Sequence, residues 1–274
     1  MMCGRFALTA TPEDVRALLG YLDRPNFPPR YNIAPTQPIA TVRQAGAERR
    51  FHLVRWGLVP SWVKDPASFT LLINARAETA AQKPSFRTAM RHHRCLIPAS
   101  GFYEWRRTPE GKQAYWIAPP DGGVIAFAGL WDTWSDPDGG EIDTAAILTV
   151  PANRTIGRIH HRMPAVLDPE DHAAWLSTGD VMARDAQALL KPAGEDDLVA
   201  VPVSDRVNKV ANDDAGLQTC IEERAGDVHG PGGDETGGED TGGEGTVGSG
   251  APAKTRKTGT GRARQTDPDQ FDLF

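Results

Sequence analysis

The chain is poor in cysteine, and none of its cysteines has the spacing of a metal ligand. Its 274 residues contain three, Cys3, Cys95 and Cys220, and no CxxC motif. An odd and scattered set argues against a disulfide framework and against a structural zinc site, and it favours a reducing compartment. We therefore expect no metal and no cofactor.

The chain also lacks a long apolar run and a signal-like leader, so we expect no membrane partner. It has no general excess of positive charge. Residues 1–223 hold 24 Lys and Arg against 27 Asp and Glu, and residues 224–274 hold 6 against 9, which gives the net charge of −6. Binding to nucleic acid therefore requires a local basic patch.

The pattern of turn formers and apolar residues predicts one α+β domain at residues 2–223, a single β-rich domain with flanking helices. Thr11, followed by Pro12 and two acids, is typical of a helix start, and this helix is expected to end near Gly20. An opening strand should include Phe6, and further strands are expected at residues 71–79, 95–98, 101–106, 114–117, 124–134, 144–150 and 199–203. Further helices are expected at residues 85–93, 168–176 and 181–190.

The composition changes at about Arg224. Residues 224–250 are mostly Gly and acids, and residues 254–264 are basic. Neither stretch buries enough apolar surface to offset the entropy of ordering. We predict a disordered linker at residues 224–269, followed by a short apolar end at residues 270–274.

Cys3 is the residue on which the functional interpretation depends. If translation starts at Met2 and that methionine is removed, Cys3 carries a free α-amine beside its thiol, and both are partly nucleophilic at neutral pH. An aldehyde that meets this pair first forms an imine, and the thiol then closes an intramolecular five-membered thiazolidine. A buried cysteine in a first strand is the alternative.

Asn74, Arg76 and Glu78 fall on one face of the expected strand, because side chains alternate with a period of two. An amide beside a guanidinium suits a sugar oxygen and a phosphate. A half-buried strand with a solvated polar face is the alternative.

Glu104 interrupts an aromatic strand and shares a face with Phe102. A desolvated carboxylate at this position suits general acid–base chemistry, and a salt bridge with an arginine is the alternative. His160 and His161 form a second polar site. Adjacent histidines on an extended chain point opposite ways and no third ligand is evident, so a proton shuttle is favoured over a metal site.

In order, these stretches resemble the SRAP family, the SOS response-associated peptidases that process abasic sites. The resemblance rests on Cys3-Gly4-Arg5-Phe6, then RYNIAPTQ, RWGLVPSW, INARAET and IPASGFYEW, then residues 159–164 and 202–213. It implies an α+β domain with Cys3 in a DNA-binding cleft, and covalent capture of the ring-opened aldehyde of abasic sites in single-stranded DNA during DNA repair. It further implies a monomer in the bacterial cytoplasm, associated with the nucleoid.

The resemblance implies catalytic roles for four residues: crosslinking for Cys3, positioning of the amine and the opened sugar for Asn74, help in imine formation for Glu104, and proton transfer at the sugar oxygen and in reversal for His160. It implies DNA contacts for a further set: phosphate contacts for Arg5, Arg76 and Arg162, and positions near the displaced base stack for Pro35 and Trp62. An exposed tryptophan of this kind suits base stacking. The doubled methionine departs from the pattern, because a retained Met1-Met2 blocks the amine.

Two other functions stay open. A thiol peptidase, acting on its own leader, would use Cys3 as nucleophile and His160 as base. The expected enzyme class, a peptidase-like hydrolase or a lyase, belongs to the crosslinking activity that the resemblance implies. A non-catalytic, clamp-tethered DNA-binding adaptor would have a structural Cys3.

The last residues resemble the short peptide by which bacterial repair proteins dock on the replicative sliding clamp. Phe271, Leu273 and Phe274 suit a hydrophobic pocket, and Gln270 suits its rim. A chance apolar ending on a solubilising tail is the alternative.

Overall fold

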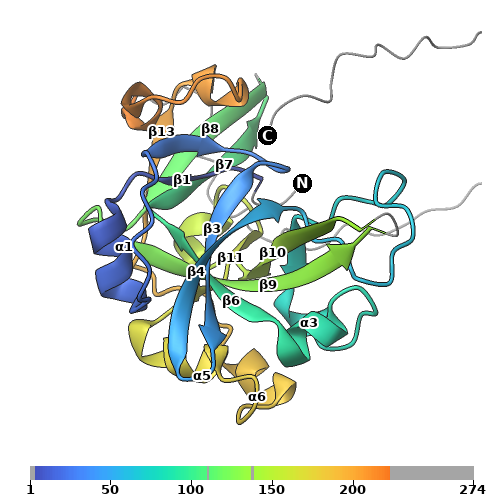
Figure 1. Ribbon diagram of the computed structural model, residues 1–274. Helices are drawn as coiled ribbons and strands as arrows, with labels where there is room; N and C mark the ends of the chain where they lie inside the picture. The colour runs from blue at the N-terminus through green and yellow to red at the C-terminus, as the bar shows by residue number, and fades with distance from the viewer. Residues whose placement is uncertain (1–3, 110, 137–138, 223–274) are drawn as a thin grey trace, which may run out of the picture. The chain divides into compact units, whose positions relative to one another are not determined.

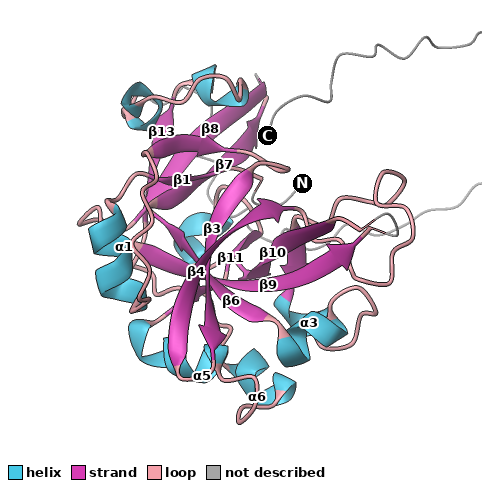
Figure 2. Cartoon of the chain, viewed as in Figure 1, coloured by secondary structure: helices cyan, strands magenta, loops and turns pink. Residues whose placement is uncertain are grey.

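The computed structural model describes residues 4–109, 111–136 and 139–222 (Figure 1). Cys3, the linker at 224–269 and the end at 270–274 lie outside these residues, so what was predicted for them stays a prediction. The described strands form two sheets, and short helices lie around them (Figure 2). The prediction of a β-rich α+β domain is confirmed.

The first sheet has five strands in the order β13-β8-β7-β1-β2, and all neighbours are antiparallel. It carries both the start of the described chain and the Glu104 strand. Its strands are β1 (Phe6–Leu8), β2 (Arg30–Ile33), β7 (Gly101–Thr108), β8 (Gly111–Ala118) and β13 (Val199–Val203).

The second sheet closes on itself. Its order is β11-β10-β4-β3-β6-β9-β12, with β5 attached to β10, and β10 also pairs with β9. The strands β10, β4, β3, β6 and β9 therefore form a barrel without free edges. The strands of this sheet are β3 (Pro38–Ala45), β4 (Glu48–Trp56), β5 (Asn74–Arg76), β6 (Arg94–Ala99), β9 (Ile125–Ser135), β10 (Glu141–Pro151), β11 (Arg162–Pro164) and β12 (Val166–Leu167).

Aromatic packing joins the two sheets. The ring of Phe6 on β1 lies edge-on to Trp56 on β4, with centroids 5.1 Å apart, and to Phe127 on β9 at 5.9 Å. All three side chains are buried. Such edge-to-face pairs add to the free energy of burial, so the first strand is fixed to the barrel core.

The helices are short and lie outside the sheets. They are α1 (Pro12–Leu19), α2 (Ala77–Ala80), α3 (Arg87–His92), α4 (Arg154–Gly157), α5 (His172–Leu176) and α6 (Ala183–Ala188), with 3₁₀ turns η1 (Pro169–Asp171), η2 (Asp205–Asn208) and η3 (Ala215–Gln218). Within the described residues, no helix has the length and apolar character needed to cross a membrane.

The first helix begins and ends where the sequence predicts. The Thr11 hydroxyl accepts the amide of Asp14 at 3.2 Å, the Asp14 carboxylate accepts the amide of Thr11 at 3.3 Å, and Pro12 is the first helical residue. Gly20 ends the helix with φ = 67°, a left-handed conformation that glycine adopts without strain. The predicted capping motif is confirmed.

The strand expected at 71–79 is confirmed only over Asn74–Arg76. Its first three residues lie outside β5, and Ala77 begins α2, whose Ala and Glu residues are strong helix formers. The hairpin of β3 and β4 was not predicted. Buried polar residues hide its alternation: Arg43 on β3 is 5% exposed and lies 3.6 Å above the ring of Trp131.

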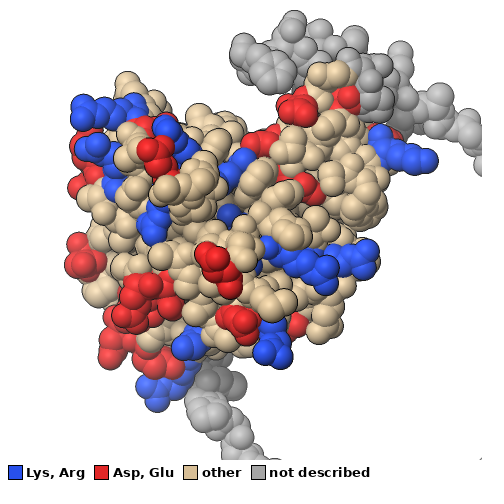
Figure 3. Space-filling view, turned by 60° about the horizontal axis from the view of Figure 1, so that its bottom comes forward, with Lys and Arg blue, Asp and Glu red and all other residues tan. Residues whose placement is uncertain are grey.

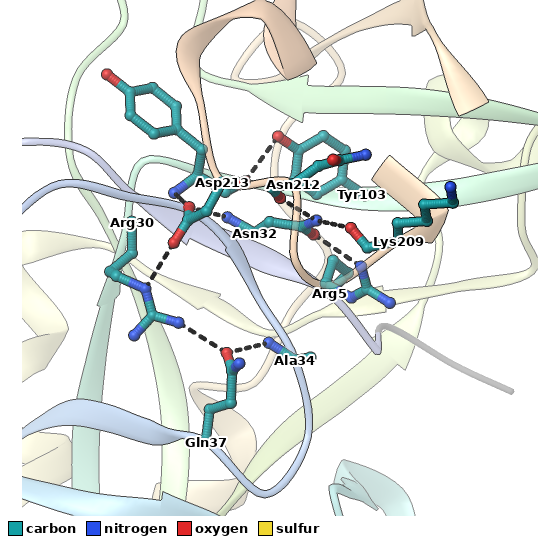
Figure 4. A network of polar contacts seen from close by, with 10 residues as sticks. Arg5, Arg30, Asn32, Ala34, Gln37, Tyr103, Lys209, Asn212 and Asp213 are labelled. Carbon is teal, nitrogen blue, oxygen red and sulfur yellow. Dashed lines mark hydrogen bonds and ion pairs between the residues drawn. The ribbon is translucent and has the colours of Figure 1, made fainter. Parts of the chain in front are cut away.

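A buried amide ties the C-terminal part of the domain to the first sheet (Figure 4). Asn32 on β2 is 1% exposed, and its Oδ1 accepts from Nη1 of Arg5 at 2.7 Å. Its Nδ2 donates to three backbone carbonyls, those of Val207, Lys209 and Asn212, at 3.3, 3.0 and 2.7 Å. One side chain thus satisfies several buried groups of the segment after β13.

Asp213 holds the same segment from the other side (Figure 4). Its carboxylate accepts from the backbone amides of Tyr31 and Asn32, the latter at 3.0 Å. It also pairs with Nε of Arg30 at 2.9 Å. Asn32 and Asp213, which come from two distant sequence motifs, therefore support the fold next to the start of β1.

We predict that Asn32→Ala lowers the free energy of unfolding by about 2–3 kcal/mol, because it removes the donor of buried carbonyls and one of the two acceptors of Arg5. Urea unfolding followed by circular dichroism measures the loss. Asn26→Ala is the matched control, because Asn26 is exposed. Equal stability of the two variants would contradict the role given to Asn32.

Candidate functional site

The pairing of β1 with β7 brings the start of the described chain to Glu104. Phe6 lies opposite Phe102 and Ala7 opposite Gly101, and the amide of Tyr103 donates to the carbonyl of Arg5 at 2.9 Å. Partners in an antiparallel pair run in opposite directions. The register therefore brings Gly4, the residue bonded to Cys3, level with Glu104.

Glu104 is buried in the middle of β7. It is 3% exposed, and its backbone pairs with Tyr115 on β8. Its Oε1 lies 4.0 Å from Nδ1 of His160. The sequence-based expectation of a desolvated carboxylate on the face of Phe102 agrees with this burial, and a histidine is an ionisable neighbour of the group.

His160 lies in the turn between α4 and β11, and the backbone of Arg162 orients it. Its Nδ1 is 3.1 Å from the carbonyl oxygen of Arg162 and 3.2 Å from the amide nitrogen of the same residue. Burial lowers the pKa of His160 below its ordinary 6.5, while the contact with the Arg162 carbonyl raises it and the positive charges of His161 and Arg162 lower it. The neutral imidazole, which can accept a proton, is therefore favoured near neutral pH.

On an extended chain the rings of His160 and His161 would point in opposite directions, as expected from the sequence. In the structure the two rings instead lie next to each other. Their centroids are 4.4 Å apart and their planes are tilted by 33°. The expectation was wrong because the chain bends at His161 before β11 begins. His160 is partly buried and faces Glu104, whereas His161 is exposed.

Asn74 and Arg76 come from the short strand β5. This strand runs parallel to β10, with Asn74 opposite Ile147 and Arg76 opposite Thr149. Asn74 is partly buried and Arg76 is exposed, with buried Ala75 between them. The predicted alternation therefore holds for these two residues, and it ends at α2, where Glu78 lies.

Arg162 makes a two-pronged ion pair with Glu78. Its Nη1 and Nη2 lie 2.8 and 2.9 Å from the two carboxylate oxygens, and it also donates to the hydroxyl and carbonyl oxygens of Thr149. Arg162 is 8% exposed. The hydrogen bond from Arg162 lowers the pKa of Glu78. A phosphate contact by Arg162 stays a prediction, and the pair with Glu78 competes with it.

Sequence reasoning missed this pair. Glu78 and Arg162 are 84 positions apart, and no local pattern connects them. The pair joins α2, which follows the Asn74 strand, to β11, whose first residue orients His160. It therefore fixes two parts of the site relative to each other.

Arg5 is oriented inwards. Its Nη1 donates to Oδ1 of Asn32 at 2.7 Å and to the carbonyl of Val207 at 2.6 Å, and burial lowers its pKa. These contacts hold the chain directly after Gly4. The phosphate contact predicted for Arg5 remains a prediction, and a structural role accompanies it.

Pro35 and Trp62 lie on two other loops. Pro35 is in the turn between β2 and β3, beside Thr36, which has a positive φ of 74°. Trp62 follows β4 and is 57% exposed, with its ring edge-on to Phe69 at 5.8 Å. This exposure leaves Trp62 available for stacking on a base.

Charged groups of both signs cover the surface. On the face in Figure 3, Lys and Arg side chains form a row toward the right, while Asp and Glu gather at the lower left. This agrees with the near-balanced composition of residues 1–223. Any attraction for nucleic acid is therefore local.

Known proteins resemble this chain along most of its length. The abasic site processing protein YoqW of Bacillus subtilis is 39% identical over 215 residues, covering 77% of this chain and 96% of that protein. The abasic site processing protein HMCES of Gallus gallus is 33% identical over 256 residues, covering 77% and 76%. A crystal structure of a protein from Bacteroides thetaiotaomicron superposes with a TM-score of 0.73 at 27% identity, covering 80% of this chain and all of the other.

The family model with the description SOS response associated peptidase (SRAP) matches residues 2–210. This span includes Glu104 and His160, the strand with Asn74, and the Arg5 anchor. Its match, together with the identity to the Bacillus protein, covers the whole candidate site. The chain belongs to the SRAP family.

Proposed function

We propose that this protein processes abasic sites in single-stranded DNA by forming a covalent bond between Cys3 and the ring-opened sugar. One observation carries the proposal. The register of β1 on β7 brings Gly4 level with the buried Glu104, whose carboxylate lies 4.0 Å from His160. The residue bonded to Gly4 is the one with the thiol. The names of the relatives from Bacillus and Gallus support the same lesion as substrate.

The chemistry follows from the groups of an N-terminal cysteine. The α-amine of Cys3 adds to the aldehyde carbon, the carbonyl oxygen takes up a proton, and loss of one water gives an imine. The thiol sulfur then adds to the imine carbon, and the thiol proton ends on nitrogen, which closes the thiazolidine. The first addition takes place within the protein–DNA complex and the second within one molecule, so both gain from proximity.

Glu104 and His160 divide the proton transfers. The buried carboxylate of Glu104 can transfer protons during imine formation, in which the former carbonyl oxygen is protonated and leaves as water. His160, which is kept neutral by burial, can accept a proton from the sugar hydroxyl as the ring opens and return it in reversal. Asn74, on strand β5, has the donors and acceptor needed to orient the opened sugar.

DNA contacts complete the proposal. Arg76 is exposed on β5 beside Asn74 and suits a phosphate next to the lesion. The exposed ring of Trp62 suits stacking on a base, and the half-buried Pro35 supplies a second apolar surface. We keep Arg5 and Arg162 as phosphate contacts that act together with their structural partners.

The end of the chain adds a partner to the proposal. Residues 270–274 carry three large apolar side chains behind a polar tail, and we propose that they dock on the sliding clamp. The 46 residues at 224–269, if flexible, reach about 35–40 Å. Tethering would raise the local concentration of the domain at single-stranded DNA beside the clamp.

The central test uses the protein with Cys3 as its first residue. Incubation with abasic single-stranded DNA should give an adduct that survives denaturing electrophoresis, and an intact mass should lack both Met1 and Met2. Cys3→Ala should lose the stable adduct and keep only a weak, reducible imine from the new amine. A stable adduct from a protein that retains both methionines would contradict the mechanism. Cleavage of peptides without an adduct would favour a thiol peptidase, and DNA binding without either would favour an adaptor.

Glu104→Gln and His160→Ala should slow formation of the adduct by about 10²–10⁴-fold, as expected for loss of an acid–base group. Rapid-quench kinetics on gels measure the rate. His161→Ala serves for comparison: it removes the exposed neighbouring ring and keeps the groups of the His160–Glu104 contact, so its effect should be much smaller. If both variants react at the wild-type rate, these roles are wrong.

The ratio of the wild-type rate to the His160→Ala rate isolates the titration of this imidazole. Because the pKa of His160 is lowered from 6.5, the ratio should decrease as the pH falls, with the midpoint of the decrease below pH 6.5. A midpoint above pH 6.5 would contradict a lowered pKa of His160.

A peptide of residues 265–274 should bind the host's sliding clamp, because Phe271, Leu273 and Phe274 supply apolar anchors. In the full-length protein, Leu273→Ala combined with Phe274→Ala should remove clamp binding, measured by isothermal titration, and leave adduct formation unchanged. Unchanged clamp affinity in this double variant would leave the tail as a solubility element.

A further inference from the structure

The stretch from Arg76 to Arg94 is a basic part of the described chain. It contains five Lys and Arg and a single acid, Glu78. That acid is occupied by its ion pair with Arg162. The stretch therefore has a strong local positive charge, although the domain as a whole is slightly acidic.

Three of these cations lie in one row, which we call the α3 row: Lys83, Arg87 and Arg91. The amide of Arg87 donates to the carbonyl of Lys83 at 2.9 Å, so the helical turn already begins at Lys83. Residues four apart lie on the same face of a helix, with a rise of about 6 Å between them. The opposite face is buried through Ala89 and Met90.

The α3 row is free to bind. All three side chains belong to exposed residues, and no ion pair involves them within the described part of the chain. Arg94 differs, because it is buried and donates to four backbone carbonyls, among them Trp175 at 2.6 Å. Arg94 fixes the helix, and the α3 row faces solvent.

A groove lies along this helix. Its volume is about 710 Å³, and its lining includes Arg91 and His92 of α3 together with Met182, Arg184 and Asp185. Arg184 lies 3.6 Å from Asp185, and its side chain is 94% exposed; Met182 is 74% exposed. Arg91 supplies a cation without an ion pair and Met182 an apolar surface, and this combination suits a sugar–phosphate backbone.

The groove is linked to the candidate site through α2. Gln187, which lines it, donates to the carbonyl of Glu78 at 3.4 Å. Glu78 lies on α2, which begins directly after Arg76, and Ala81 and Gln82, which follow α2, also line the groove. The segment that follows the Asn74 strand thus leads to the groove and to the α3 row.

We propose that the α3 row and this groove bind the phosphate backbone of the DNA that flanks the lesion. This inference rests on the proposed function and extends its footprint beyond the catalytic residues. Each Lys or Arg that neutralises a phosphate releases a counterion, so the contribution of the row depends on salt. Long DNA is bound more tightly than short DNA for this reason, whatever its sequence.

The test uses a double variant of the full-length protein, Arg87→Glu combined with Arg91→Glu, which we call the α3 variant. It is compared with a matched charge control. The control combines Arg24→Glu with Lys191→Glu, since both residues are exposed and lie outside this stretch. Fluorescence anisotropy measures the affinity for two unmodified oligothymidylates over a range of salt concentrations. One covers only the catalytic site and the other extends well past it. Thermal unfolding checks that all variants are folded.

The α3 variant should bind the long oligonucleotide more weakly, and the slope of log Kd against log salt concentration should fall by about 1.4, about 0.7 for each lost contact to single-stranded DNA. It should bind the short oligonucleotide like the control. Equal slopes for the α3 variant and the control would overturn the inference. Failure of the wild-type protein to bind or capture abasic DNA at all would instead overturn the proposed function.

Discussion

The antiparallel register of β1 on β7 is the constraint on which the site depends. Two hydrogen-bonded strands fix which residue of one lies opposite which residue of the other, and a slip by one residue would turn every side chain to the other face. Here the register sets Phe6 opposite Phe102 and brings Gly4 level with Glu104. Because Phe6 is locked against Trp56 and Phe127 of the barrel, the register cannot slip without opening the core. A chain start is ordinarily one of the least fixed parts of a domain, and in this fold it is attached to the core within three residues of Cys3.

The C-terminal part of the domain stabilises this arrangement from outside. Asn32 and Asp213 satisfy backbone groups that would otherwise be buried without partners. Arg5 donates both to Asn32 and to the carbonyl of Val207. The buried network works only when all its members are present. The residues of the motifs around 30–37 and 202–213 therefore belong to the support of the site rather than to its reacting groups. A second support, the ion pair of Glu78 with Arg162, holds the Asn74 strand and the His160 turn together.

Local patterns in the sequence predict local structure well in this protein. The capping motif at Thr11 and Gly20, the five strands between 95 and 150, and the last strand at 199–203 follow from side-chain alternation and turn residues. The barrel does not follow from such patterns. Arg43 on β3 can be buried because Asp143 neutralises its charge and Trp131 covers it, and those partners come from distant strands.

The candidate site divides in the same way. The chemical types of Glu104 and His160 are visible in the sequence, and the burial of Glu104 can be predicted from its aromatic neighbours. The 4.0 Å distance between Glu104 and His160 depends on how two separate sheets are arranged. The close contact of the His160 and His161 rings depends on a bend that an extended chain would lack. The inward orientation of Arg5 and Arg162 depends on Asn32 and Glu78. Long-range partners of this kind have no local signature in one sequence.

Covalent capture by both the amine and the thiol of Cys3 is the central claim, and the bonding at the captured carbon tests it most directly. Abasic single-stranded DNA with ¹³C at the aldehyde carbon, incubated with the protein that begins at Cys3, can be followed by NMR. A thiazolidine predicts one tetrahedral carbon bonded to nitrogen and sulfur. A trigonal imine carbon that persists, or an unreacted sugar carbon, would contradict it.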